Sequence, residues 1–569
     1  TADNAVSWIS LEYGWPVGST SVKRTTDGTL LAEYIIDGPA TEYVNETLTY
    51  FSPAFEVIDR YELARYITPY GIGLTLGEEG WTWIFDVTDY APLLRDSVQL
   101  EAGNWQELLD LKFAFIEGTP AREVKRVDAF WKGTHNLATF DENITDHVFS
   151  PAPGEEQFRL KTRASGHGFG SGNNCGEFCF NTHSVAVNGQ TQWSWEIMQE
   201  CADNPLYPQG GTWIYDRAGW CPGAPVETKD WELTDLVSSS EPFAVDYNID
   251  YDPDGNYRFE GQIIAYAAPN FTHDVEISEV LSPSDFKLHS RTNPICESPT
   301  IRIRNNGTSP ITSCSFSYYV SGENGNVGEV VTGTWGGNLG FLESVDVALP
   351  YEDAILFDGG EEEHLTFHVT VELPGDEQLN NNSTESSFHR VPTWSYPELD
   401  DNRLIIWTKT NNVPWETQVE LTNADGEVVW ERGYADANTT YRDTIEINQG
   451  CYRFTINDAG DDGTDFWANS DGSGFTRIKR VAGGNFVNFE PDFGKFISQA
   501  FHFETNLISA VDEISAAPTL SPSLVAFPNP ADDMIRVRVD GDFISGKLRR
   551  VTWRDPLGRV VKDEMMRVA

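Results

Sequence analysis

The chain is poor in positive charge and in sulfur. Its 569 residues include 39 Lys and Arg against 88 Asp and Glu, a net charge of −49, with only seven Cys and four Met. A surface this acidic repels nucleic acid and anionic membranes, so we expect neither as a partner. No apolar run approaches the ~20 residues that span a bilayer, so we predict no transmembrane segment. Helical periodicity is almost absent, which excludes helical bundles.

What is present is typical of strands. Hydrophobic residues make up 40% and aromatic residues 12% of the chain, as in a globular protein. Runs such as WTWIFDVTDY, RLIIWTKT and IRVRVDG alternate and are separated by Gly, Asn, Asp and Pro clusters. The fold class is therefore predicted to be all-β. A chain this long divides into several domains, and polar or Pro-rich stretches place the boundaries near residues 268, 391 and 507.

The cysteines occur at short spacings, at 175/179, 201/221 and 296/314, with Cys451 alone. Such clusters indicate an oxidising compartment. Zinc is the alternative for a close Cys pair, but the Glu between Cys175 and Cys179 and the lack of a second Cys-x-x-Cys favour disulfides. Pairing of near neighbours is the simplest assignment, and Cys296 with Cys314 could join two strands. The chain begins at Thr1, and we expect a processed, exported form.

One stretch has the composition of a site. The run CGEFC places the carboxylate of Glu177 between two cysteines, and DRAGWCPG places Arg217 and Trp220 just before a third. A disulfide across the short loop would fix the direction of the acid, as acid–base or recognition chemistry requires.

These motifs, together with YELARYITPYG, FDVTDYAPLL and KFAFIEGTP upstream, resemble the bacterial peptide-N-glycosidase F family. The resemblance implies two eight-stranded antiparallel jelly rolls, at residues 1–135 and 136–268, that cut N-glycans from Asn without a required cofactor. It implies disulfides Cys175–Cys179 and Cys201–Cys221. It places Glu177 as the acid beside the sugar cleft and Arg217 and Trp220 as substrate-binding residues. We add His167, at a position where the family has a tryptophan in the cleft wall, and Trp213, which could line the cleft.

The resemblance fails at one catalytic position. The family carries an Asp-Arg pair on the strand before the ITPY motif, where this chain reads VNET. Glu46 is the carboxylate that could take its place, and Glu101 falls near the family's second acidic position. Three functions stay open: an amidase that uses Glu177, Glu46 and Glu101, a protein that binds N-glycans or glycoproteins without turnover, and a structural surface protein.

Histidines add a weaker alternative. His167 lies in a Gly-rich turn and His183 on the strand after the Glu177 loop, but the chain has no His-x-His or His-Glu-x-x-His spacing. We therefore interpret both as structural or polar cleft residues rather than ligands of a transition metal.

The sequence of the second half of the chain predicts two further β-sandwiches. Residues 269–391 read as an Ig-like β-sandwich that serves as a spacer. Residues 392–507 carry the turn NDAGDDGTDF, whose carboxylates are the hard oxygen ligands that calcium prefers. The expected calcium ligands are Asp458, Asp461, Asp462 and Asp465, and an acidic, solvated turn without an ion is the alternative.

The end of the chain, FPNPADDMIRVRVDG followed by VTWRDPLGRVV, resembles the C-terminal sorting domain of the type IX secretion system. Residues 508–569 would then be a linker and a small β domain, recognised by the translocon and sorting machinery. The expected location is the medium or the outer cell surface.

Overall fold

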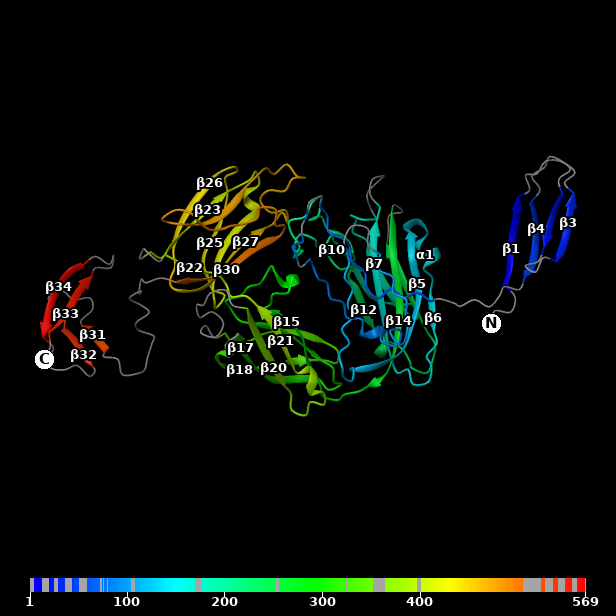
Figure 1. Ribbon diagram of the computed structural model, residues 1–569, viewed down its shortest axis with the longest axis horizontal. Coiled ribbons are helices and arrows are strands. Elements are labelled where there is room, and N and C mark those ends of the chain that lie inside the picture. The colour runs from blue at the N-terminus through cyan, green and yellow to red at the C-terminus, as the bar shows by residue number, and fades with distance from the viewer. Residues whose placement is uncertain are drawn as a thin grey trace. The chain divides into compact units, whose positions relative to one another are not determined.

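The computed structural model is built almost entirely from antiparallel β-sheets, which confirms the all-β class (Figure 1). One α-helix lies among the described residues, α1 (Phe140–Asn143). The 3-10 helices are η1 (Thr88–Tyr90), η2 (Leu137–Thr139), η3 (Thr234–Leu236), η4 (Lys287–His289), η5 (Leu379–Asn381) and η6 (Pro414–Glu416). The structure describes residues 5–12, 20–24, 29–35, 43–50, 59–71, 74, 76–78, 80–103, 108–168, 176–250, 255–322, 325–351, 364–396, 401–504, 523–527, 536–540, 548–554 and 560–567.

The chain divides into two compact units, Thr1–Leu63 and Ala64–Ala569. The first unit holds two two-stranded antiparallel sheets. Their strands are β1 (Ala5–Glu12) with β4 (Tyr43–Tyr50), and β2 (Thr20–Arg24) with β3 (Leu30–Ile35). Glu46 lies on β4 opposite Ile9.

A β-sandwich of two four-stranded sheets follows. One sheet has the order β12 (Thr228–Glu232), β7 (Gln157–His167), β14 (Asn256–Pro269), β5 (Arg122–Asn136). The other has the order β6 (His147–Phe149), β13 (Phe243–Asp250), β8 (Thr182–Val187), β9 (Gln190–Glu196). The two sheets enclose one apolar core that contains Leu160, Val185, Tyr247, Phe259 and Ile263. The boundary predicted at residues 135 and 136 falls inside β5, so this strand belongs to the sandwich.

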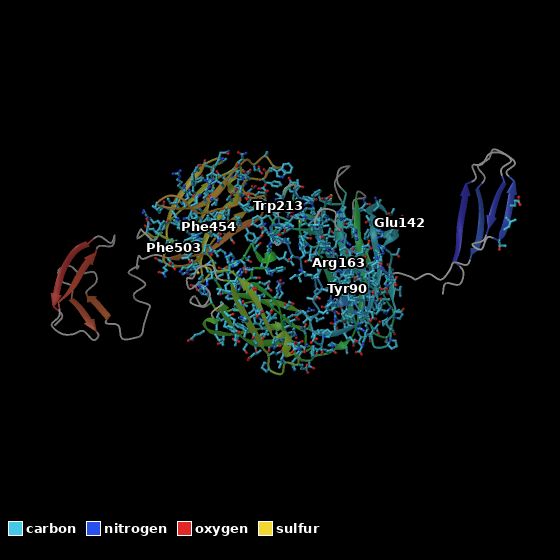
Figure 2. All side chains as sticks on the ribbon, in the orientation of Figure 1. Tyr90, Glu142, Arg163, Trp213, Phe454 and Phe503 are labelled. Carbon is cyan, nitrogen blue, oxygen red and sulfur yellow. A yellow bond between two sulfur atoms is a disulfide. The ribbon has the colours of Figure 1, made fainter. Side chains whose placement is uncertain are left out.

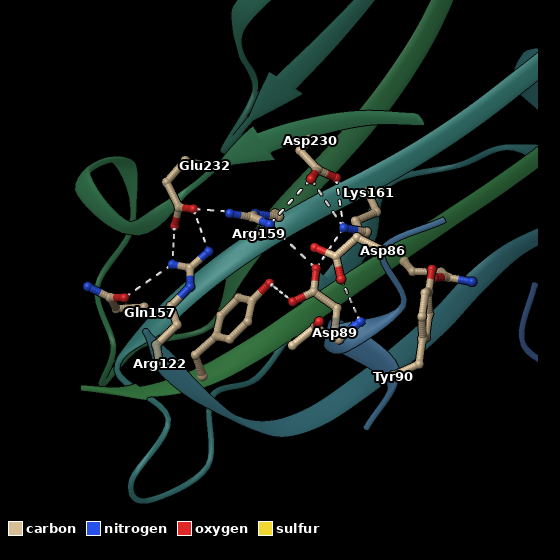
Figure 3. A network of polar contacts seen from close by, with 12 residues as sticks. Asp86, Asp89, Tyr90, Arg122, Gln157, Arg159, Lys161, Asp230 and Glu232 are labelled. Atoms are coloured by element: carbon tan, nitrogen blue, oxygen red, sulfur yellow. Dashed lines mark hydrogen bonds and ion pairs between the residues drawn. The ribbon is translucent and has the colours of Figure 1, made fainter. Parts of the chain in front are cut away.

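Strand β7 shows why this sheet has two different faces. Phe158 and Leu160 lie in the core, and because successive side chains alternate across a strand, Arg159 and Lys161 face the opposite side. Charges on that face are neutralised from η1: Asp89 contacts Lys161 at 2.6 Å and Arg159 at 3.4 Å (Figure 3). Burial opposes the charged form of Asp89, but these two cations outweigh it and lower its pKa.

The segment before β5 is therefore held on a charged sheet face by ion pairs and hydrogen bonds. Tyr90 donates to Gln262 at 2.6 Å and accepts from Arg163 at 3.0 Å. Further along the face, Arg65 donates to Ser165 Oγ at 2.9 Å. Between residues 59 and 121, the described chain forms no strand longer than one isolated bridge, Tyr66 with Pro225. Side-chain contacts, rather than a continuous ladder of backbone hydrogen bonds, therefore hold this segment on the sheet.

The third region is a sandwich of a three-stranded and a four-stranded sheet. Its strands are β15 (Val275–Ser282), β16 (Thr300–Asn305) and β19 (Ser344–Ala348) in one sheet, and β18 (Gly325–Leu339), β17 (Ile311–Gly322), β20 (Leu365–Glu372) and β21 (Ser383–Phe388) in the other. The core between them includes Ile301, Phe316 and Phe367.

The fourth region is a sandwich of five and four strands. The first sheet has the order β22 (Thr393–Ser395), β30 (Phe496–Glu504), β27 (Gly450–Asp458), β24 (Thr417–Asn423), β25 (Val428–Gly433), with β22 parallel to β30. The second has the order β26 (Thr440–Glu446), β23 (Arg403–Lys409), β28 (Phe475–Arg480), β29 (Asn485–Asn488). Phe454 and Phe503 lie in the core between the sheets (Figure 2).

The C-terminal residues form two antiparallel pairs, β31 (Ser523–Phe527) with β32 (Arg536–Asp540), and β33 (Leu548–Arg554) with β34 (Val560–Arg567). No helix in the described chain combines the length and the apolar character needed to cross a membrane.

Candidate functional site

The candidate site is built on two irregular segments that a disulfide and short ladders hold together. Cys201 and Cys221 are bonded, with 5.4 Å between their Cα atoms, as the sequence predicted. Next to the disulfide, β10 (Met198–Gln199), just before Cys201, pairs with β11 (Arg217–Ala218) inside the closed loop. The backbone N–H of Ala218 donates to the carbonyl of Glu177 at 2.9 Å, which brings the two predicted site segments side by side.

The structure brings Glu177 and Arg217 together. Arg217 Nε donates to Glu177 Oε1 at 3.1 Å, and the guanidinium is 1% exposed while the carboxylate is 14% exposed. The remaining nitrogens of Arg217 bond to the chain itself: Nη1 to the carbonyl of Tyr215 at 2.5 Å and Nη2 to that of Thr212 at 2.9 Å. Arg217 therefore lies behind the carboxylate and orients it, and its fork is occupied by the chain's own oxygens rather than open to a substrate.

Tyr70 also belongs to the site. In the sequence analysis it appears only within the YELARYITPYG motif, without an assigned role. The Arg217 guanidinium carbon lies 5.4 Å from the centre of its ring. Burial raises the pKa of the Tyr70 phenol, which the charge of Arg217 opposes and the charge of Glu177 reinforces. A protonated phenol and a carboxylate thus share one guanidinium.

Tyr70 reaches this position through a backbone ladder. The carbonyl of Ile67 accepts from Gly223 at 3.0 Å, and the carbonyl of Tyr70 accepts from Gly210 at 2.7 Å. Gly210 approaches Gly71 so closely that a Cβ on Gly210 would lie 2.8 Å from the Gly71 Cα, so neither position has room for a larger residue. The ITPYG stretch and the glycines at 210 and 211 were the sequence signal for this contact.

Two of the predicted sugar-binding tryptophans are core residues. Trp220 is 4% exposed, and its Nε1 donates to the carbonyl of Gly166 at 2.7 Å. Trp213 is 0% exposed, and its Nε1 donates to Asp492 Oδ1 at 3.1 Å. The expectation that these two rings offer a face to a sugar is therefore wrong for this structure, because both rings are packed and hydrogen-bonded inside the protein.

The two histidines are neutral structural residues. His167 bonds Ser165 Oγ at 3.0 Å and lies beside the Trp220 ring, with centroids 5.4 Å apart. Burial and the charge of Arg65 lower the pKa of His167 to about 4. His183 is fully buried, bonds the Tyr247 hydroxyl at 2.6 Å, and burial lowers its pKa to about 3.

The other predicted catalytic carboxylates are not placed beside Glu177 by the described contacts. Glu46 belongs to the first compact unit, and its side chain lies outside the described residues. Glu101 is exposed on a segment without regular secondary structure. Within the described residues, Glu177 is thus the carboxylate that the Arg217 and Tyr70 cluster contains.

The remaining cysteines correct one predicted pairing. Cys179 is disulfide-bonded, and its predicted partner Cys175 lies outside the described residues. Cys296 and Cys314 are free and buried, so the predicted disulfide between them does not form. Cys296 instead hydrogen-bonds Cys451, a contact that lowers the pKa of the Cys451 thiol.

The predicted calcium ligands separate into two groups. Asp458 and Asp462 converge with Glu416, which the sequence did not single out. Asp461 adopts a left-handed φ of 60°, and Asp465 accepts from Ser473 Oγ at 2.8 Å. Neither of these two belongs to the group that could hold a metal ion.

Comparison with known proteins agrees with the motifs. A family profile described as "Peptide-N-glycosidase F, C terminal" matches residues 136–267. Those residues match the second half of the proposed glycosidase-like region.

A curated relative, the peptide-N(4)-(N-acetyl-β-D-glucosaminyl)asparagine amidase F of Elizabethkingia miricola, is 29% identical over 208 residues. The alignment covers 33% of this chain and 57% of that protein, so the chain spans little more than half of the relative. Among solved structures, a peptide-N(4)-(N-acetyl-β-D-glucosaminyl)asparagine amidase is 24% identical, with 36% of this chain and 74% of that one covered and a TM-score of 0.27. PNGase F from Flavobacterium meningosepticum is 25% identical, with 26% and 47% covered and a TM-score of 0.20.

Proposed function

We propose that this protein binds the N-glycan–asparagine linkage of glycoproteins through the region 59–268. The observation that carries the proposal is that Glu177 and Tyr70 both lie beside the buried Arg217. A carboxylate accepts hydrogen bonds and a protonated phenol donates them. That pair suits a secondary amide, whose N–H donates and whose carbonyl accepts. The name of the curated relative, an asparagine amidase, supports the same linkage.

Hydrolysis of that amide is the second candidate function, and the chemistry of Glu177 favours it. The carboxylate would take a proton from water as the oxygen of that water attacks the amide carbon. The Tyr70 hydroxyl would donate to the oxyanion that develops. The C–N bond then breaks, leaving an aspartate on the peptide and a glycosylamine that carries the proton. Binding without hydrolysis needs only the hydrogen bonds between the amide and the side chains of Glu177 and Tyr70.

Binding and hydrolysis are tested on the full chain with one N-glycopeptide and its deglycosylated aspartyl form. We expect the glycopeptide to bind and the aspartyl form to bind at least about tenfold more weakly. Glu177→Gln should lose most of that preference, whereas Glu142→Gln, an exposed carboxylate on α1, should keep it. Mass spectrometry of the same mixture reports whether Asn is converted to Asp. Equal binding of both peptides would contradict the proposal.

We also propose that the protein is exported by a type IX secretion system through residues 508–569. The Cys201–Cys221 disulfide supports an oxidising compartment. Deleting residues 523–569 in a secretion-competent host should leave the protein inside the cell, while the full chain reaches the medium or cell surface. Export of the deleted form would contradict the proposal.

A further inference from the structure

Three carboxylates converge at one end of the fourth sandwich. Asp458 ends β27, Asp462 follows in the next turn, and Glu416 ends η6 on the neighbouring connection. One oxygen from each lies within 4.8 Å of the others. The turn is closed on itself at Gly460, where an added Cβ would lie 2.7 Å from Glu416 Oε2 and 3.3 Å from Asp458 Oδ2. The two side chains therefore turn toward the same small space above the glycine.

One oxygen in this group has no partner. Asp458 is 3% exposed, and its Oδ2 accepts from the backbone N–H of Asp462 at 3.1 Å. Its Oδ1 is fully buried and forms no hydrogen bond with the described chain. None of the three carboxylates has an ion pair with a Lys or Arg of the described residues. Burying an unpaired carboxylate oxygen is costly, and natural sites relieve that cost with a counter-ion.

We propose that Glu416, Asp458 and Asp462 bind one calcium ion. All three ligands are hard oxygens, which calcium prefers and softer transition metals do not. Calcium accepts six to eight oxygens in irregular geometry, so backbone carbonyls and water can complete its shell. Magnesium requires a tighter octahedron and should bind more weakly.

The ion would also stiffen the support of the candidate site. The chain that follows Asp462 packs on the Arg217 segment: Trp467 Nε1 donates to the carbonyl of Gly211 at 2.7 Å. The Phe466 ring lies 6.0 Å from that of Tyr215. Tyr215 supplies one of the carbonyls that fix Arg217. Calcium should therefore protect residues 211–217 from hydrogen exchange, whether or not the site binds a glycan.

The test uses the full chain stripped with a chelator and then given calcium chloride or magnesium chloride. We expect calcium to raise the melting temperature of the fourth sandwich by several degrees and magnesium to raise it less. Asp458→Asn should abolish the calcium shift, and Glu416→Gln should weaken calcium binding about tenfold. Asp465→Asn is the matched control: it removes a charge from the same turn outside the cluster, and its shift should equal that of the unmodified protein.

A folding defect is distinguishable from loss of the ion. Without calcium, Asp458→Asn should melt no lower than the unmodified protein, because it removes a buried unpaired charge. A calcium shift that survives in both Asp458→Asn and Glu416→Gln would overturn the proposed ligands. The absence of any shift or bound calcium at millimolar concentration in the unmodified protein would overturn the site itself.

Discussion

The loop around Glu177 and the turn around Asp458 are two solutions to the same problem. Each holds a carboxylate away from water at one end of a sandwich. At Glu177 the chain supplies its own cation, because Arg217 is buried behind the acid and bonds it at 3.1 Å. At Asp458 the described chain supplies further carboxylates instead. We therefore expect the first site to need no added ion and the second to recruit one.

The largest effect is expected from removing the internal cation. Arg217→Met leaves Glu177 without its partner and breaks the bonds to Thr212 and Tyr215. Breaking a buried pair costs about 3–5 kcal/mol, so thermal melting of the 136–268 sandwich should move down by many degrees. Arg217→Lys should recover only part of the lost stability, because an ammonium group cannot reproduce the planar, forked set of donors of a guanidinium. Unchanged melting of Arg217→Met would remove the basis of the comparison.

Among the described residues, disulfide-bonded cysteines occur only in the Glu177 region, and the Cys201–Cys221 bond is the second feature that distinguishes this region. Cys201 and Cys221 close a loop with a sequence separation of 20. Replacing both by Ala should cost about 3 kcal/mol, since the unfolded chain regains the entropy of that loop. Denaturant unfolding measures the loss. Reductant should destabilise the unmodified protein more than the double variant, which keeps the disulfide of Cys179; equal sensitivity of the two proteins would assign the effect to that other disulfide.

Acid should weaken the sandwich that carries Glu177. His183 and His167 have folded pKa values of about 3 and about 4, below the usual 6.5. As pH falls below 6.5 the unfolded chain binds protons first, so stability present above pH 6.5 is lost progressively toward pH 4. The two shifts together predict a loss of about 5 kcal/mol at pH 4.5. His183→Gln should flatten this pH profile, and His364→Gln, an exposed histidine of another sandwich, should not.

The same chemical change, from a carboxylate to an amide, can be made in both regions, and it involves the smallest expected changes in stability. Glu177→Gln weakens a charge-assisted bond and should lower stability by about 1 kcal/mol. Asp458→Asn, measured without calcium, relieves repulsion and should raise it by a similar amount. The same chemical change thus has opposite signs in the two regions. Unfolding of both variants in chelator measures it, and equal signs would show that the two environments do not differ as described.

Sequence reasoning reached the fold class, because the strand pattern is local, and it assigned Glu177 and Arg217 to one site through the family motifs, although it did not predict the bond between them. It missed contacts between distant segments. Trp213 reads as a cleft residue, yet its partner Asp492 lies 279 residues away and covers it. Cys296 has a near neighbour in sequence but meets Cys451 in space. At the acidic turn, the sequence analysis named four aspartates, whereas the structure groups two of them with Glu416 from a separate connection.

The most direct test of the account is a double-mutant cycle on glycopeptide binding with Tyr70→Phe, Glu177→Gln and both together. If the phenol and the carboxylate hold one amide between them, their effects are coupled, and the double variant should lose about 0.5–3 kcal/mol less than the sum of the single losses. Strictly additive losses, or single variants that bind as tightly as the unmodified protein, would show that Arg217 does not assemble a common binding site.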